Sequence, residues 1–95
     1  MLRLVLRIPG SRSLKDRRRV VAALRDRLQA RHRVLVADVG HLEAQEAAVL
    51  AVSCLGNDSR LLQSTLDQAR SDVLSHAEAI VTDMQVDVLP WPVIP

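Results

Sequence analysis

The chain has 95 residues, 48% of them hydrophobic, and its 13 Lys and Arg against 11 Asp and Glu residues give a formal net charge of +2 at pH 7. This length supplies one domain with a single modest core, and the longest apolar runs fall far short of the roughly 20 residues that a membrane span needs. The one cysteine, Cys54, excludes an internal disulfide and fits a reducing compartment, so we expect a soluble cytoplasmic protein.

The first third of the chain predicts a strand followed by a helix. Apolar residues and Arg alternate over Leu2–Ile8, which is the period of a half-buried strand, and Pro9-Gly10-Ser11 ends it. Ser13 with Asp16 three residues later resembles a capping box, so we expect a helix from about Leu14. Its buried stripe consists of apolar residues at helical spacing, namely Val20, Val21, Leu24 and Leu28.

The rest of the chain predicts two strands, a second helix and a last strand. Residues 33–39 and 47–55 have strand character, and Gly56-Asn57-Asp58 breaks the pattern before a helix. Alternation returns at Ile80 and ends at Pro90-Trp91-Pro92. The order β-α-β-β-α-β predicts a ferredoxin-like α+β fold, a four-stranded antiparallel sheet with both helices on one face. We expect a single domain over residues 1–95, with a folded core of 1–89 and an extended tail of 90–95.

Three segments resemble a known family. The stretch from Ile8 to Arg18 contains Ser13-Leu14-Lys15-Asp16-Arg17, which resembles the "SLKEKR" signature of the YlxP-like bacterial proteins, a domain of unknown function. Residues 36–41 and 56–58 fall where that family has its next recurring segments, although Gly40 replaces a usual acidic residue and Gln45 a usual aromatic one. The resemblance covers residues 2–89. It implies a ferredoxin-like fold and a gene neighbourhood shared with translation-initiation and ribosome-maturation factors, but no established activity.

The charges are distributed unevenly along the chain. Residues 1–33 contain eleven Lys and Arg and two Asp residues, a net +9, whereas residues 34–95 contain two Arg and nine acidic residues, a net −7. Such a dipole steers an anionic partner toward one side of a protein. Arg3 and Arg7 are expected on the helix-free face of the sheet with Asp83 and Asp87, where they would form cross-strand ion pairs.

The start of the first helix is the candidate binding site. A solvated helix face explains many basic runs, but cations in the first turn oppose the helix dipole, by about 0.3–1 kcal/mol each. Free backbone N–H groups, serine hydroxyls and guanidinium groups together would hold an anion such as phosphate. The predicted anion or nucleic-acid surface consists of Ser11, Arg12, Ser13, Lys15, Arg17, Arg18 and Arg19, with Arg25 extending it.

The sequence narrows how RNA would bind. RNA readers with this sheet topology stack bases on aromatic residues of the sheet, and the first three strands contain none. The binding mode that is left is contact with the phosphate backbone of structured RNA or of a ribosomal particle. Such contact has little sequence specificity. We therefore expect a non-enzymatic binding protein without a cofactor.

Other chemistry has weaker support in the sequence. His41, Glu43 and Glu46, with Asp38 nearby, would offer metal ligands, but their spacing matches no recognised motif. The acids of this loop would instead pair with Arg17 or Arg18 and reduce the basic surface. Cys54 has no base beside it in sequence, so a packed strand residue is the better interpretation.

An interaction between proteins is the alternative function. Sheets of this fold leave one face uncovered, and we expect Val5, Val34 and Val36 on that face. Trp91 between two prolines would be an exposed anchor of a kind enriched at protein interfaces. The alternative is therefore a homo-oligomer or a protein-interaction module.

Overall fold

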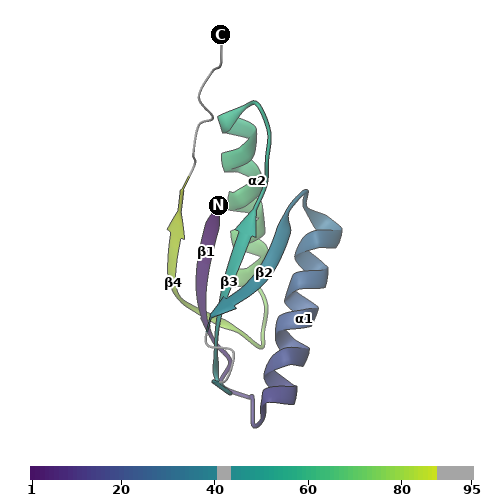
Figure 1. Cartoon of the computed structure of the whole chain (residues 1–95), viewed down its shortest axis with the longest axis vertical. Helices are drawn as coiled ribbons and strands as arrows, with labels where there is room; N and C mark the ends of the chain where they lie inside the picture. The colour runs from purple at the N-terminus through teal and green to yellow at the C-terminus, as the bar shows by residue number, and fades with distance from the viewer. Residues whose placement is uncertain (41–43, 88–95) are drawn as a thin grey trace.

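The fold follows the predicted order of elements. The computed structural model describes residues 1–40 and 44–87. Its elements are β1 (Leu2–Arg7), α1 (Leu14–Arg31), β2 (Leu35–Gly40), β3 (Ala47–Ser53), α2 (Ser59–Leu74) and β4 (Ile80–Val86). The strands form one antiparallel sheet in the order β2-β3-β1-β4; Figure 1 shows α2 behind the sheet and α1 at the right, beside β2. The predicted ferredoxin-like α+β fold is confirmed.

Both helices begin at side-chain caps. The Ser13 hydroxyl accepts a hydrogen bond from the Asp16 backbone N–H at 3.1 Å, as a capping box requires. The Asp16 carboxylate departs from the standard motif, because it accepts from the N–H of Arg12, one residue before the cap, at 3.1 Å. In α2 the carboxylate of Asp58 accepts from two N–H groups of the first turn. Local sequence therefore determines where each helix starts.

The core is aliphatic and lies between the sheet and the helices. Alternate residues of β1 and β3 point into it, and the predicted stripe of α1 covers them. Its central members, each at most 2% exposed, include Leu2, Leu4, Leu6, Val20, Leu24, Leu28, Leu50, Val52, Leu66 and Val73. Among residues 1–40 and 44–87, this core contains no aromatic side chain.

Strand β2 has the opposite face inward from the one predicted. Val34 and Val36 are only 7% and 9% exposed and belong to the core, whereas Leu35 and Val39 are 73% and 55% exposed on the helix-free face. The prediction that Val34 and Val36 lie on that open face was wrong. This segment has apolar residues on both sides of the strand, so alternation alone did not determine its facing. Val5 does lie on the open face, half-buried opposite Val49.

Of the ion pairs expected between the first and last strands, the one between Arg3 and Asp83 forms. Arg3 lies 3.6 Å from Asp83, with both side chains at least half exposed. Arg7 pairs in register with Ile80, whereas the N–H of Asp87 bonds to the carbonyl of Met1 at the other end of the sheet. Arg7 and Asp87 are therefore too far apart along the strands to interact.

Two further predictions concern the ends of the chain and its helices. None of the helices among residues 1–40 and 44–87 is long and apolar enough to cross a membrane. The predicted tail of residues 90–95, with Trp91, and the core boundary at residue 89 lie outside the described residues.

Candidate nucleic-acid interface

Arg17 lies inside the protein, although we expected it on the basic surface. Its side chain is 1% exposed. Its Nη1 and Nη2 atoms donate to the two carboxylate oxygens of Asp38 at 2.8 and 3.1 Å, and Nε and Nη2 donate to the carbonyls of Ala47 and Gly40 at 2.7 and 3.2 Å. Four of the five donors of the guanidinium are therefore occupied within the chain. Arg17 has no place in a surface that binds an external anion.

The contacts of Arg17 connect the start of α1 to the ends of β2 and β3. Gly40 ends β2 and Ala47 begins β3, so one guanidinium holds both ends of the connection between these strands against the start of α1. Asp38 faces the helix layer because β2 has the register described above. The sequence left open the alternative that a nearby acid neutralises Arg17. In the structure this is the case, and the acid is Asp38.

The serine hydroxyls are also used within the chain. Ser11 is 4% exposed and donates to the carbonyl of Ser13 at 3.0 Å, while the hydroxyl of Ser13 caps the helix. A cavity of about 210 Å³ adjoins this end of α1, and the carboxylates of Asp16 and Glu78 line it together with Arg19. Two carboxylates oppose the entry of an anion. The helix N-terminus and its serines therefore do not form the phosphate cradle that the sequence suggested.

What remains is a row of cations on the outer side of α1 and in the segment just before it. Arg12, Lys15 and Arg18 are exposed, and none has a carboxylate within 4.0 Å among the described residues. Arg25 lies about two helical turns beyond Arg18, and its ion pair is with its exposed neighbour Asp26, at 3.3 Å. We call Arg12, Lys15, Arg18 and Arg25 the α1 cation row.

The α1 cation row lies on the side of the helix away from α2. Arg19 and Arg27, on the other flank, reach Glu78 and Asp72 at 3.0 and 2.7 Å. Gln29 continues the spacing of the row and accepts a hydrogen bond from the N–H of Val36 in β2 at 3.0 Å. Lys15 to Arg25 covers ten residues, so the row is about 15 Å long beside the edge of the sheet.

A second charged cluster was not predicted from the sequence. The carboxylate of Asp72 in α2, 8% exposed, contacts Arg27 at 2.7 Å, His32 at 3.0 Å and Arg31 at 3.3 Å. Burial raises the pKa of Asp72, but hydrogen bonds from Arg27 and His32 and the charges of Arg27 and Arg31 outweigh it, so the net pKa lies below its usual 3.8. These partners are 40 to 45 residues away in the chain, too far for any local motif. The cluster joins the end of α1 to α2 and gives Arg27 and Arg31 a carboxylate partner within the chain.

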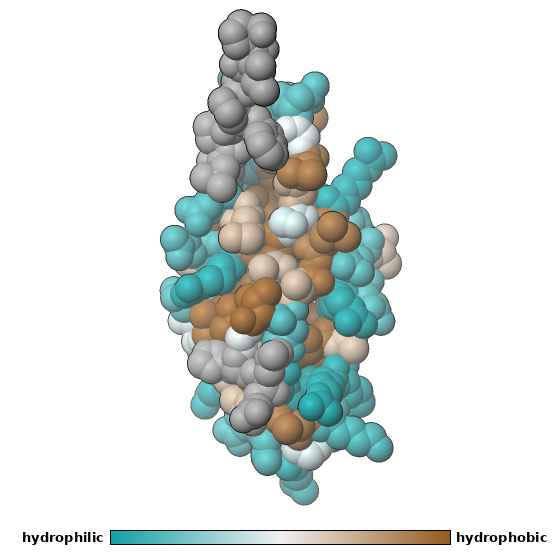
Figure 2. All heavy atoms as spheres, in the orientation of Figure 1, coloured by the Kyte–Doolittle hydropathy of each residue, from teal (hydrophilic) through white to brown (hydrophobic). Residues whose placement is uncertain are grey.

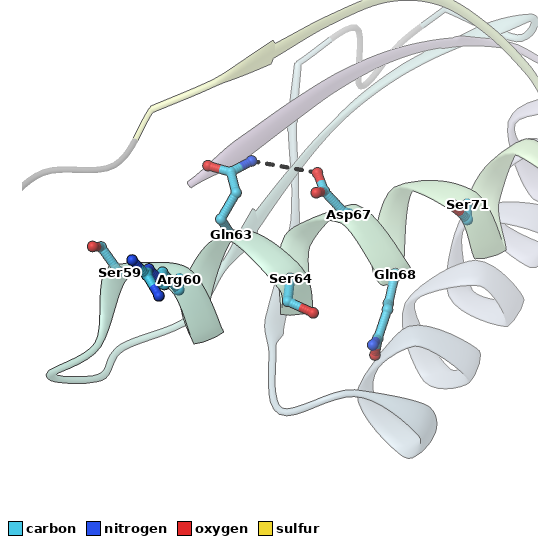
Figure 3. Close-up of a pocket in the computed structure, with 7 residues that line it drawn as sticks. All are labelled: Ser59, Arg60, Gln63, Ser64, Asp67, Gln68 and Ser71. Carbon is cyan, nitrogen blue, oxygen red and sulfur yellow. Dashed lines mark hydrogen bonds between the residues drawn. The ribbon is translucent and has the colours of Figure 1, made fainter.

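A shallow depression along α2 does not form a binding site. All of its lining side chains come from the outer side of α2, as Figure 3 shows, namely Ser59, Arg60, Gln63, Ser64, Asp67, Gln68 and Ser71. One of its members, Gln63, donates to Asp67 at 3.3 Å. A single helix gives such a depression no opposite wall, so a small ligand there would stay largely in water.

The candidate metal ligand Asp38, the cysteine and a histidine near β4 all have neighbours within the fold. Asp38, one of the possible metal ligands, is bound by Arg17, while His41 and Glu43 lie outside the described residues. Cys54 is partly buried and packs on the core, with its sulfur 3.9 Å from the carbonyl oxygen of Leu62. The ring of His76 accepts from the N–H of Glu78 in the turn before β4.

The chain was also compared with known proteins. Residues 1–86 match the family described as "Protein of unknown function (DUF503)", and the chain therefore belongs to this family. The search of curated proteins found no match. Membership agrees with the expectation of a domain of unknown function and assigns no activity.

Proposed function

We propose that this chain is a non-enzymatic binding protein of the YlxP-like type that contacts the phosphate backbone of structured RNA through the α1 cation row. The observation that carries the proposal is the division of the cations. Arg17, Arg27 and Arg31 have buried or shared carboxylate partners, whereas Arg12, Lys15 and Arg18 extend into solvent without one in the described part of the chain.

Two arginines with exposed ion pairs supply further contacts, Arg25 within the row and Arg19 on the opposite flank of α1. Arg19 and Arg25 form ion pairs whose side chains are 47 to 70% exposed. Exposed pairs of this kind contribute about 0–1 kcal/mol, so a phosphate group can replace the carboxylate at little cost. Guanidinium groups bind phosphate with two parallel hydrogen bonds, which suits a contact along a nucleic-acid backbone.

The shape of the row favours a duplex over a single strand. Three cations spread over about 15 Å along a straight helix match phosphates on a rigid backbone, because the spacing is set by the helix. The described residues contain no Phe, Tyr or Trp, so their sheet has none of the rings on which single-strand readers of this topology stack bases. Ribosomal RNA is the structured RNA that the YlxP-like resemblance suggests.

The test is a salt titration of binding to a short RNA duplex. Contacts with three or four phosphates predict that affinity falls roughly a hundredfold between about 50 and about 200 mM salt. Co-sedimentation with ribosomal particles at low salt, and release at high salt, is expected on the same ground. Affinity that is independent of salt would contradict the proposal.

Charge reversal identifies the surface. Arg18→Glu and Lys15→Glu should each weaken duplex binding by about tenfold and reduce the salt slope by about one. Arg60→Glu is the matched control, because Arg60 is exposed on α2 and the change in net charge is the same. Equal loss in all three variants would mean that binding responds to net charge and not to this row. Arg17 is left intact, because a glutamate there would face Asp38 in the interior.

A further inference from the structure

Arg7 is an exposed cation that the α1 cation row does not include. It ends β1 and lies on the open face of the sheet, which Figure 2 shows with apolar side chains over its middle and hydrophilic ones around them. The pair with Asp87 that the sequence predicted does not form, because Asp87 lies at the other end of the strands. In the described part of the chain, no carboxylate lies within 4.0 Å of the Arg7 guanidinium.

The neighbours of Arg7 in the sheet are uncharged. It is level with Ala47 of β3 on one side and with Ile80 of β4 on the other. By contrast Arg3, on the same strand and face, lies 3.6 Å from Asp83. The fold therefore pairs one of the two outward arginines of β1 and leaves the other in water.

The turn after β1 places Arg7 close to the α1 cation row. The N–H of Ser11 donates to the carbonyl of Ile8 at 3.1 Å, which closes a four-residue turn. The Cα atoms at the two ends of such a turn lie within about 7 Å, and each flanking residue adds at most about 3.8 Å. The Cα atoms of Arg7 and Arg12, the first member of the row, are therefore at most about 15 Å apart.

These two arginines flank a small, exposed tip. Arg7 belongs to the sheet, whereas Arg12 comes just before α1, on the other side of the turn (Figure 1). Pro9 and Gly10 at the tip are both exposed, and a Cβ added at Gly10 would meet no atom within 4 Å. The tip thus has no long side chain and borders open space.

We propose that Arg7 and the α1 cation row contact the two strands of one RNA duplex, with the tip of Pro9 and Gly10 over the groove between them. This inference rests on the proposed function and deepens it, because both strands become part of the binding site. Double-stranded RNA is recognised mostly through phosphate and 2′-hydroxyl contacts across its wide, shallow minor groove. Two cations on either side of a small tip suit phosphates on either side of such a groove.

Arg3 offers a matched control for Arg7. Both arginines are exposed on the same face of β1, so a change to Gln alters the net charge equally at either position. Arg3 is four residues, or about 14 Å, farther from the turn, and it has Asp83 beside it. The proposed arrangement therefore uses Arg7 and does not use Arg3.

The test compares an RNA duplex with one unpaired strand by fluorescence anisotropy over a range of salt concentrations. On the duplex, Arg7→Gln should weaken binding about tenfold at about 50 mM salt and lower the salt slope by about one, while Arg3→Gln stays within about twofold of wild type. On the single strand, Arg7→Gln should bind like wild type, because a strand along the row offers no second backbone. Arg18→Gln should weaken binding to both.

The outcomes separate this inference from the proposed function. Equal losses in Arg7→Gln and Arg3→Gln would overturn the inference, and so would a loss for Arg7→Gln that is as large on the single strand as on the duplex. In both cases a loss in Arg18→Gln would still support the row. If Arg18→Gln leaves duplex binding unchanged, the proposed function itself fails, and the two-strand contact fails with it.

Discussion

Three arginines that are adjacent in the sequence have different environments in the fold. Arg17, Arg18 and Arg19 are neighbours in sequence, yet the first is buried, the second extends into solvent and the third pairs with Glu78. Successive helical residues point about 100° apart, so three adjacent arginines face the core, one flank and the other flank. The basic run is thus not a single surface.

Removal of Arg17 should destabilise the fold more than removal of its neighbour. Arg17→Met leaves Asp38 and the carbonyls of Gly40 and Ala47 without their donor, and breaking a buried pair from one side costs about 3–5 kcal/mol. Urea unfolding measures the change in free energy. Arg18→Met is the control and should remain within about 0.5 kcal/mol of wild type. Similar values for both variants would contradict the buried role of Arg17.

The facing of β2 can be tested at two adjacent residues. Val36→Ala removes two buried methyl groups and should lower the unfolding free energy by about 1.5 kcal/mol or more, from the transfer energy of buried carbon. Leu35→Ala should change it by less than about 0.5 kcal/mol, because Leu35 is mostly in water. The reverse order of these values is expected only if β2 had the facing first predicted from its sequence.

At the level of elements, α1 has three different neighbours around its circumference. Its apolar stripe packs on the sheet, Arg19 and Arg27 reach toward α2 and the turn after it, and the α1 cation row faces solvent beside β2. Ion pairs between the two helices form at the Asp72 cluster near the end of α1. Because Asp72 pairs with the arginines on the α2 side of α1, the cations without a carboxylate partner lie on the opposite side of the helix.

The Asp72 cluster makes stability depend on pH. The folded pKa of Asp72 lies below its usual 3.8, so its contribution is complete above the unfolded pKa and is lost as the pH falls through the folded value. Asp72→Asn should cost about 1.5–3 kcal/mol near neutral pH, the range for hydrogen bonds to charged groups. Urea unfolding of both proteins at several pH values should show this difference narrowing below about pH 4. A difference that stays constant down to pH 2 would exclude the carboxylate as its source.

At the scale of the whole molecule, the proposed RNA contacts lie on both layers of the fold. The α1 cation row belongs to the helix layer, and Arg7 belongs to the sheet (Figure 1). The turn of residues 8–11 joins the two layers at one end of the molecule.

Contacts on separate layers predict additive losses. The double variant Arg7→Gln with Arg18→Gln should lose duplex-binding free energy equal to the sum of the two single losses, within about 0.5 kcal/mol, because the two residues share no partner. Fluorescence anisotropy at one salt concentration measures wild type and the three variants. A double variant that binds no more weakly than either single variant would mean that both residues act on the same contact.

Much of this arrangement could be predicted from local sequence. The order of elements, the capping of α1 by Ser13 and the buried stripe of Val20, Leu24 and Leu28 depend on periodicity and on contacts within four residues. The candidate site could be predicted only as a region. Its exposed members Arg12, Lys15, Arg18 and Arg25 were included, but so were Arg17, Ser11 and Ser13, whose polar groups bond within the chain.

The sequence by itself determined that the protein is a ferredoxin-like domain with a basic first third, because strands, helices and caps follow from neighbouring residues. Only the tertiary structure decided which cations remain available. Arg17, Arg27 and Arg19 meet their carboxylates 21, 45 and 59 residues away. The tertiary structure also decided the facing of β2, since a strand with apolar residues on both sides is oriented by what packs against it.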